Sequence, residues 1–203
     1  RYIGDWSSDV CSSDLHVLLR EFNRVLGLHL EGHVVMLPGM MPSWSRGSAA
    51  VNLFTKTEQF DHGNWIKTAI TVAANTTVAP DGATTAETLT VTSGLHNIRQ
   101  DVAVLPSTQY TFSWHALRGT MTDLHYAVFN MNALSFIVPD TSYYASTNSS
   151  TWSRISVTFT TPVGCTTIRP WMLRDSGVAS GTVFLWGAQL EIGGAMNPYV
   201  PVG

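Results

Sequence analysis

The sequence predicts an all-β fold, an antiparallel sandwich of two sheets, and three observations support this expectation. Apolar and polar residues alternate with a period of two over several short runs, as they do in strands that bury one face. Clusters of Pro, Gly, Asp and Ser lie between the runs, where turns are expected. No helical period interrupts them after residue 52, so the pattern indicates a sandwich rather than a βαβ fold.

The N-terminal segment has a different pattern. Residues 15–26 carry apolar side chains at the i, i+3, i+4, i+7 spacing of one helix face, which predicts a short N-terminal helix. Gly27 ends this helix, and the Pro-, Gly- and Ser-containing stretch that continues to residue 50 predicts a linker. The segment is either the end of an upstream domain, an oligomerising helix, or a stretch carried in with the residues that precede it.

Those preceding residues have an unusual origin. Residues 5–15 read DWSSDVCSSDL, which matches the translation of a common short-read library adapter, so we interpret them as an artefact of a metagenomic sequence. Cys11 lies within this string, which leaves Cys165 as the one native thiol and excludes an intramolecular disulfide. The expected organisation is an artefact at 1–15, a helix plus linker at 16–51, and one domain at 52–203.

Within this domain two runs alternate most clearly. The apolar face of run 110–117 is Tyr110, Phe112, Trp114 and Ala116, and that of run 154–160 is Ile155, Val157 and Phe159. Similar runs lie near 69–74, 86–92, 96–105, 123–131, 166–174 and 182–191. Turns are expected between them at 80–82, 93–94, 118–119, 139–140 and 175–177. The sequence therefore predicts about eight or nine short strands.

Composition narrows the classes of partner. Charged residues make up only 12% of the chain, against about 25% in an average soluble protein. The formal net charge of -3 gives no basic field that would attract phosphates, so we expect no nucleic-acid partner. No run approaches the roughly 20 apolar residues that a membrane-spanning helix needs.

Three stretches carry a resemblance to a known domain type. They are the opening NLFTKTEQFDHGNWIK, the middle WSRISVTFTTP and the closing LWGAQLEIGGAMNPYVPV. In this order they resemble a jelly-roll domain that is frequent in structural and tail proteins of tailed phages, and they are similar to CenC-type carbohydrate-binding modules of families 4 and 9. The resemblance covers residues 52–203. It implies two antiparallel sheets, one of them concave, and non-catalytic binding of sugars or surfaces.

The alternation separates core tryptophans from candidate binding residues. Trp114 and Trp186 share faces with apolar neighbours and are expected in the core, where Trp65 closes one edge. Trp152 is in phase with Arg154, and Trp171 is in phase with Arg169, so both indoles are expected to face outward. A sugar ring stacks its apolar face on an aromatic ring and hydrogen-bonds planar polar groups. We therefore expect the ligand site to contain Trp152, Arg154, Arg169, Trp171, His115 and Ser113.

The alternative interpretation of these pairs is that each arginine stem packs over an indole as an ordinary surface contact. No catalytic motif is present: the sequence lacks G-x-S-x-G, H-E-x-x-H and a phosphate-binding glycine loop, so we expect no enzyme and no cofactor. The resemblance implies that a structural calcium is common in such jelly rolls. Asp61, Glu58 and Glu191 are the candidate ligands, although Gln189 stands where calcium-binding relatives often have a carboxylate.

The expected function is non-catalytic carbohydrate binding by an adhesion module of a phage virion or tail protein, located on the virion or outside the cell. Its partners are carbohydrate on a bacterial surface or other virion subunits, including copies of the same chain. The alternative function is a structural or decoration module that joins virion subunits without binding sugar, since protein interfaces also favour Trp, Tyr and Arg. A second alternative is an accessory domain of a polysaccharide depolymerase.

Overall fold

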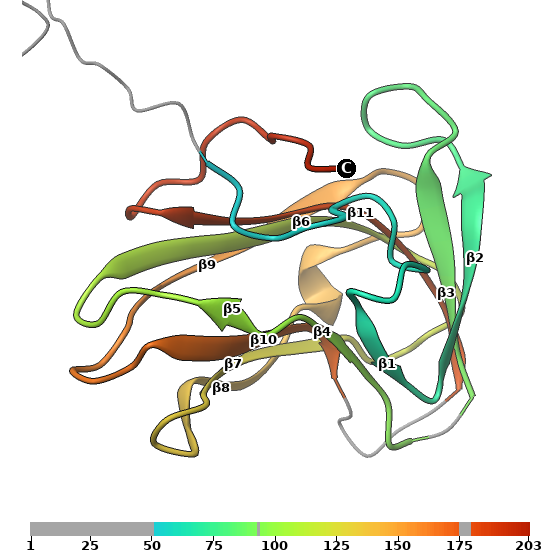
Figure 1. The fold of residues 1–203 in the computed structure, drawn as a ribbon. Coiled ribbons are helices and arrows are strands. Elements are labelled where there is room, and N and C mark those ends of the chain that lie inside the picture. The colour runs from blue at the N-terminus through green and yellow to red at the C-terminus, as the bar shows by residue number, and fades with distance from the viewer. Residues whose placement is uncertain (1–50, 93, 175–179) are drawn as a thin grey trace, which may run out of the picture. The chain divides into compact units, whose positions relative to one another are not determined.

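The computed structural model describes residues 51–92, 94–174 and 180–203, and these form two antiparallel sheets packed face to face (Figure 1). The predicted all-β sandwich is therefore confirmed. The adapter-like string, the helix predicted at 15–26, the linker and the turn predicted at 175–177 lie outside the described residues. Within the described part, no helix has the length and apolar character needed to cross a membrane.

The six-stranded sheet has the order β1-β4-β10-β7-β8, with β5 beside β10. Its strands are β1 (Ile66–Thr68), β4 (Asn97–Arg99), β5 (Val102–Ala103), β7 (His125–Asn130), β8 (Ser135–Ser142) and β10 (Thr167–Arg174). The five-stranded sheet has the order β2-β3-β11-β6-β9. Its strands are β2 (Ile70–Thr77), β3 (Ala86–Val91), β6 (Gln109–Arg118), β9 (Ser153–Thr160) and β11 (Gly181–Ile192). One 3-10 helix, η1 (Tyr144–Ser146), lies between β8 and β9.

One predicted turn is wrong. Pro139 and Asp140 lie within strand β8 instead of between two strands. A proline cannot donate a backbone hydrogen bond, but β8 is the last strand of its sheet, where a strand needs a partner on one side only. Pro139 and Asp140 therefore mark an edge strand, and the chain does not reverse direction at these two residues.

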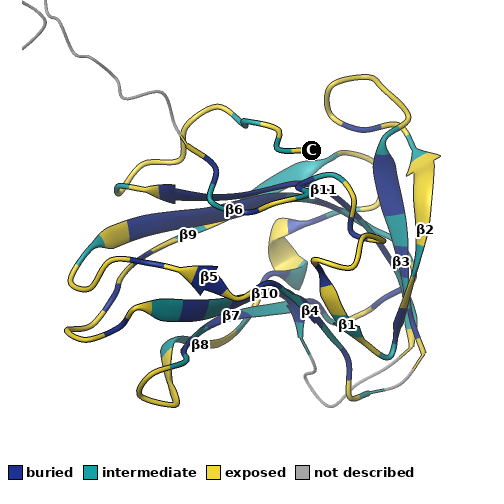
Figure 2. Ribbon diagram, in the orientation of Figure 1, coloured by how far each residue is buried: buried dark blue, intermediate teal, exposed yellow. Residues whose placement is uncertain are grey.

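The core lies between the inner faces of the two sheets, and Figure 2 shows β6 and β11 as mostly buried. Trp65 and Trp114 are fully buried in it, as predicted. Phe54 and Phe60 lie with ring centroids 5.3 and 5.1 Å from that of Trp65, so the opening segment closes one end of the core. Cys165 is buried as a free thiol.

A β-bulge in β11 changes the face on which Trp186 lies. The pairing of β11 with β6 shifts between Trp186 and Gln189, and Gly187 adopts a left-handed φ of 62°. Leu185 and Ala188 both point into the core, so Trp186 lies on the outer face of the sheet. Trp186 is buried, but its predicted place in the core between the sheets is wrong, because the alternation does not continue through the bulge.

We expect Gly187→Ala to lower the free energy of unfolding by about 2 kcal/mol. An alanine here would hold a left-handed φ, and its Cβ would lie 3.2 Å from His115 Nδ1 and 3.4 Å from the ring of Tyr199. Urea denaturation followed by circular dichroism measures the change. Gly63→Ala is the matched control, because a Cβ at Gly63 has no heavy atom within 4 Å. Equal stability of the two variants would contradict the assigned role of the bulge.

Candidate functional site

The structure divides the six predicted binding residues between the two sheets. Ser113 and His115 lie on β6, and Arg154 lies on the neighbouring β9 with Trp152 just before it, so these four belong to the five-stranded sheet. Arg169 and Trp171 lie on β10 of the six-stranded sheet. The predicted single constellation is therefore not formed, because the two sets lie on opposite outer faces of the sandwich.

The C-terminal segment covers much of the outer face of the five-stranded sheet. Gln189 Oε1 accepts a hydrogen bond from Val200 N at 2.7 Å. Glu191 accepts two from Asn197, at 3.0 Å from its backbone N and 2.6 Å from its Nδ2. Asn52 Nδ2 donates to Val200 O at 2.9 Å, which joins the two ends of the domain. The chain therefore occupies this part of the face with its own backbone.

Most predicted residues on this face make contacts within the protein. Arg154 Nη1 donates to Asn197 O at 2.8 Å, and its Nη2 donates to Ser113 Oγ at 3.1 Å. Ser113 is fully buried. Trp152 Nε1 donates to Val78 O at 2.9 Å, and Trp152 packs against the small cluster of Ala79, Ala86 and Trp186. These hydrogen bonds tie the polar groups of Trp152, Arg154 and Ser113 to other parts of the protein.

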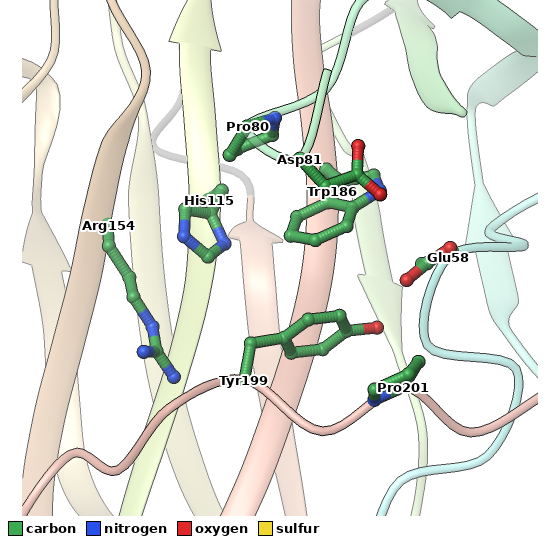
Figure 3. A pocket seen from close by; sticks show the side chains of 8 residues that line it. All are labelled: Glu58, Pro80, Asp81, His115, Arg154, Trp186, Tyr199 and Pro201. Atoms are coloured by element: carbon green, nitrogen blue, oxygen red, sulfur yellow. The ribbon is translucent and has the colours of Figure 1, made fainter. Parts of the chain in front are cut away.

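A pocket of about 450 Å³ remains open beside the covering segment (Figure 3). Trp186, Tyr199 and His115 lie at its centre, with Arg154 on one side and the carboxylates of Glu58 and Asp81 on the other. Burial, followed by the nearby charge of Arg154, lowers the pKa of His115 to about 4, so this imidazole is neutral at physiological pH.

The outer face of the six-stranded sheet has a different composition. Trp171, Phe129 and Phe136 form an aromatic cluster, with centroid distances of 6.0 Å from Trp171 to Phe129, 5.1 Å from Phe129 to Phe136 and 6.3 Å from Trp171 to Phe136. Phe129 pairs with Arg169 on one side and with Phe136 on the other, so the cluster extends across three adjacent strands. Phe136 is 45% exposed, and the cluster is therefore accessible.

Arginines surround this aromatic cluster. The guanidinium carbon of Arg174 lies 5.4 Å from the ring centroid of Trp171 and 5.1 Å from that of Phe136, within cation–π range. Arg99 lies opposite Trp171 in the strand pairing and donates a hydrogen bond to Asn97. A second, smaller pocket of about 260 Å³ adjoins Trp171 and Arg174. The face thus combines exposed aromatic surface with planar hydrogen-bond donors.

The acidic residues of this face are paired with cations. Arg169 donates from Nε and Nη2 to the two carboxylate oxygens of Asp101, at 2.6 and 2.7 Å. This hydrogen-bonded pairing lowers the pKa of Asp101. Asp140 lies 2.7 Å from Arg174 Nη1 and 2.8 Å from His125 Nδ1. Both carboxylates therefore hold the arginines in place.

Sequence reasoning missed four residues of this face, namely Phe129, Phe136, Arg99 and Arg174. Phe129 was not recognised as outward-facing because the run 123–131 has apolar residues on both faces of the strand. Phe136 lies in strand β8, which was not predicted. Arg174 follows a second bulge, where Met172 and Leu173 are both buried in the core.

The opening loop surrounds the ammonium group of Lys67. Lys67 Nζ lies 2.9 Å from the carbonyl oxygen of Phe60 and 3.0 Å from those of Asp61, His62 and Trp65. The ammonium group thus satisfies carbonyl oxygens that converge on one point.

Nearby, buried Glu87 accepts a hydrogen bond from Asp61 N at 3.1 Å. Burial, followed by the charge of Asp61, raises the pKa of Glu87 to about 7.

The three candidate calcium ligands are not gathered into one site. Across residues 51–92, 94–174 and 180–203, no group of three or more His, Cys, Asp or Glu side chains is placed to hold a metal ion. Glu191 directs both carboxylate oxygens to Asn197, while Glu58 lines the pocket beside Tyr199. Calcium binding stays a prediction.

Comparison with known proteins identifies the fold. No family model and no curated protein matches the sequence. The chain is similar to the enzymatically active domain of bacteriophage CBA120 tailspike protein 4, with a TM-score of 0.52 and 15% identity over 70% of this chain and 21% of that one. The chain thus spans about a fifth of that domain's length.

Two further solved structures are similar. One is the CBM22-1 xylan-binding domain of Paenibacillus barcinonensis Xyn10C, with a TM-score of 0.50 and 12% identity over 73% of this chain and 98% of that one. The other is arabinose-bound MgGH51 α-L-arabinofuranosidase, with a TM-score of 0.50 and 13% identity over 64% of this chain and 23% of that one. At these identities the likeness shows a common β-sandwich fold.

We expect Lys67→Met to lower the free energy of unfolding by about 2 kcal/mol, because the loop carbonyls lose a charged hydrogen-bond donor. Urea denaturation at neutral pH measures this loss. Lys56→Met is the matched control, since the side chain of Lys56 makes no hydrogen bond with any described residue. A loss of similar size in both variants would show that the carbonyl contacts of Lys67 are not the cause.

Glu87 is expected to make stability depend on pH. The folded protein keeps the proton of Glu87 up to about pH 7, whereas the unfolded chain releases it near 4.5. The stabilisation is therefore fully present below pH 4.5 and is lost as the pH rises towards 7. His115 has the opposite trend, because its folded pKa is lowered.

Because the two trends overlap, the contribution of Glu87 is measured as the difference in unfolding free energy between the wild type and Glu87→Gln. Between pH 5 and 8, the unfolding free energy of the wild type should fall by about 2 kcal/mol relative to that of Glu87→Gln. Urea denaturation at a series of pH values gives both curves. A constant difference between them would contradict the raised pKa.

Proposed function

We propose that this protein is a non-catalytic carbohydrate-binding module that binds glycan along the outer face of the six-stranded sheet. The observation that carries the proposal is the cluster of exposed Phe136 with half-buried Trp171 and Phe129, beside the guanidinium groups of Arg99 and Arg174. Aromatic rings offer stacking surface for the apolar face of a sugar. The guanidinium groups offer planar donors for its hydroxyls.

Three further observations support the proposal, and the first of them supports the choice of face. The outer face of the other sheet is largely covered by the C-terminal segment. The carboxylates of Asp101 and Asp140 are each paired with an arginine, which favours binding over general acid catalysis. One similar structure is a xylan-binding domain of the same β-sandwich fold.

The proposed setting is the adhesion of a phage virion or tail protein to carbohydrate on a bacterial surface. The phage resemblance of the sequence and the likeness to part of a tailspike support it. The tailspike likeness also supports the variant in which the chain is an accessory domain of a polysaccharide depolymerase. In either setting the sheet face has the same role.

A structural module that joins virion subunits is the competing function. The half-exposed ring of Phe136 favours it, because exposed aromatic residues beside arginines are also common at protein interfaces. In that case the face would bind another subunit, or a second copy of this chain, instead of a sugar.

An array of bacterial surface polysaccharides, probed with the full chain, distinguishes these functions. Trp171→Ala should weaken glycan binding about tenfold or more, because it removes the largest ring of the cluster. Trp152→Ala is the matched control on the other sheet and should bind as the wild type does. Absence of glycan binding, together with a homo-oligomer that Trp171→Ala dissociates, would instead establish the structural function.

A further inference from the structure

The pocket on the five-stranded sheet has the features of a second ligand site, independent of the proposed glycan face. It lies beside the covering C-terminal segment, and its walls come from the opening loop, the loop after β2, strands β6, β9 and β11, and the segment itself (Figure 3). Its volume of about 450 Å³ lies within the range of small-molecule sites.

The aromatic rings of this pocket are held in fixed positions. The centroids of Trp186 and Tyr199 lie 4.6 Å apart, and the ring of His115 lies 5.2 Å from Trp186. Trp186 Nε1 donates to Thr85 Oγ1 at 2.9 Å, and Tyr199 OH lies 2.6 Å from Thr57 Oγ1. Because these polar atoms are bonded within the protein, the rings offer the pocket mainly their apolar and π surface.

Two carboxylates lie on one side of these rings. Partial burial raises the pKa of Glu58, a hydrogen bond with Tyr199 opposes this, and the negative charge of Asp81 raises it further. Asp81 Oδ1 accepts a hydrogen bond from Ala83 N at 2.9 Å. Neither Glu58 nor Asp81 forms an ion pair with any described residue.

The positive charge of the pocket lies on the other side. Figure 3 shows Arg154 across the rings from Glu58. Its guanidinium group donates to Asn197 O and to Ser113 Oγ. His115 is neutral at physiological pH, so it does not balance the carboxylates. The side formed by Glu58 and Asp81 therefore has uncompensated negative charge next to aromatic surface.

We propose that this pocket binds a substituted ammonium group, placed between the rings of Trp186 and Tyr199 and the carboxylates of Glu58 and Asp81. Aromatic rings attract an organic cation through the negative potential of their π faces. The two carboxylates add Coulomb attraction, which is stronger in a partly desolvated pocket than in water. A neutral ligand of the same shape lacks both interactions.

The probe is choline, and its control is 3,3-dimethyl-1-butanol, which has the same shape without the charge. Titration of the full chain is followed by the NMR signal of the Trp186 indole N–H. Choline should give saturable shifts with a dissociation constant of about 1 mM, and the neutral alcohol should bind at least tenfold more weakly. Glucosamine and glucose form a second matched pair, which tests whether the ammonium group can be part of a sugar.

Two variants test the carboxylates. Asp81→Asn keeps an oxygen that can accept from Ala83 N, and Glu58→Gln keeps the shape of the side chain. Each should weaken choline binding about fivefold, and the double variant should weaken it more. Asp140→Asn, which removes a negative charge from the other sheet, should leave choline binding unchanged.

Three results would overturn this proposal. They are equal affinity for choline and its neutral analogue, choline binding by the double variant that equals the wild type, or the absence of any shift in a folded protein. Trp171→Ala should not change choline binding, because Trp171 lies on the other sheet. Failure of this site and failure of the glycan face are thus distinguishable.

Discussion

The β-bulge at Gly187 determines what the outer face of the five-stranded sheet can do. Before it, Leu185 points into the core, and after it Ala188 and Leu190 do, so both ends of β11 contribute to the same core. The outward positions are correspondingly Trp186 before the bulge and Gln189 and Glu191 after it. A regular strand would place these polar side chains in the core, at a high desolvation cost.

The outward polar residues explain why the two faces of the sandwich differ. Gln189 and Glu191 hold Val200 and Asn197, and this fastens the C-terminal segment across the five-stranded sheet. The six-stranded sheet has no such segment among the described residues, and its aromatic rings stay accessible. Because the C-terminal segment covers the outer face of the five-stranded sheet, the outer face of the six-stranded sheet is the larger surface for a macromolecular ligand.

The sequence predicted most of the strands, although not β8, and it did not predict how the strands are divided between the sheets. Alternation located the strands around Trp114 and Ile155 because both are regular and one-sided. It gave the wrong face for Trp186, because a bulge shifts the period by one residue. The grouping of Arg154 with Arg169 failed for another reason: sheet membership depends on pairing between distant segments, which no local pattern encodes. Phe136 was missed because Pro139 suggested a turn within its strand.

Both candidate sites lie next to a bulge, and this has a physical cause. In β10, the register shift after Trp171 places Met172 and Leu173 in the core and returns Arg174 to the outer face beside the indole. In β11, the shift falls at Gly187, and because glycine has no side chain the ring of Tyr199 can approach the strand there. Regular pairing spaces outward side chains evenly along each strand. A bulge breaks that spacing and brings an aromatic ring and a second ligand-facing group together, while the inner face remains a continuous apolar core.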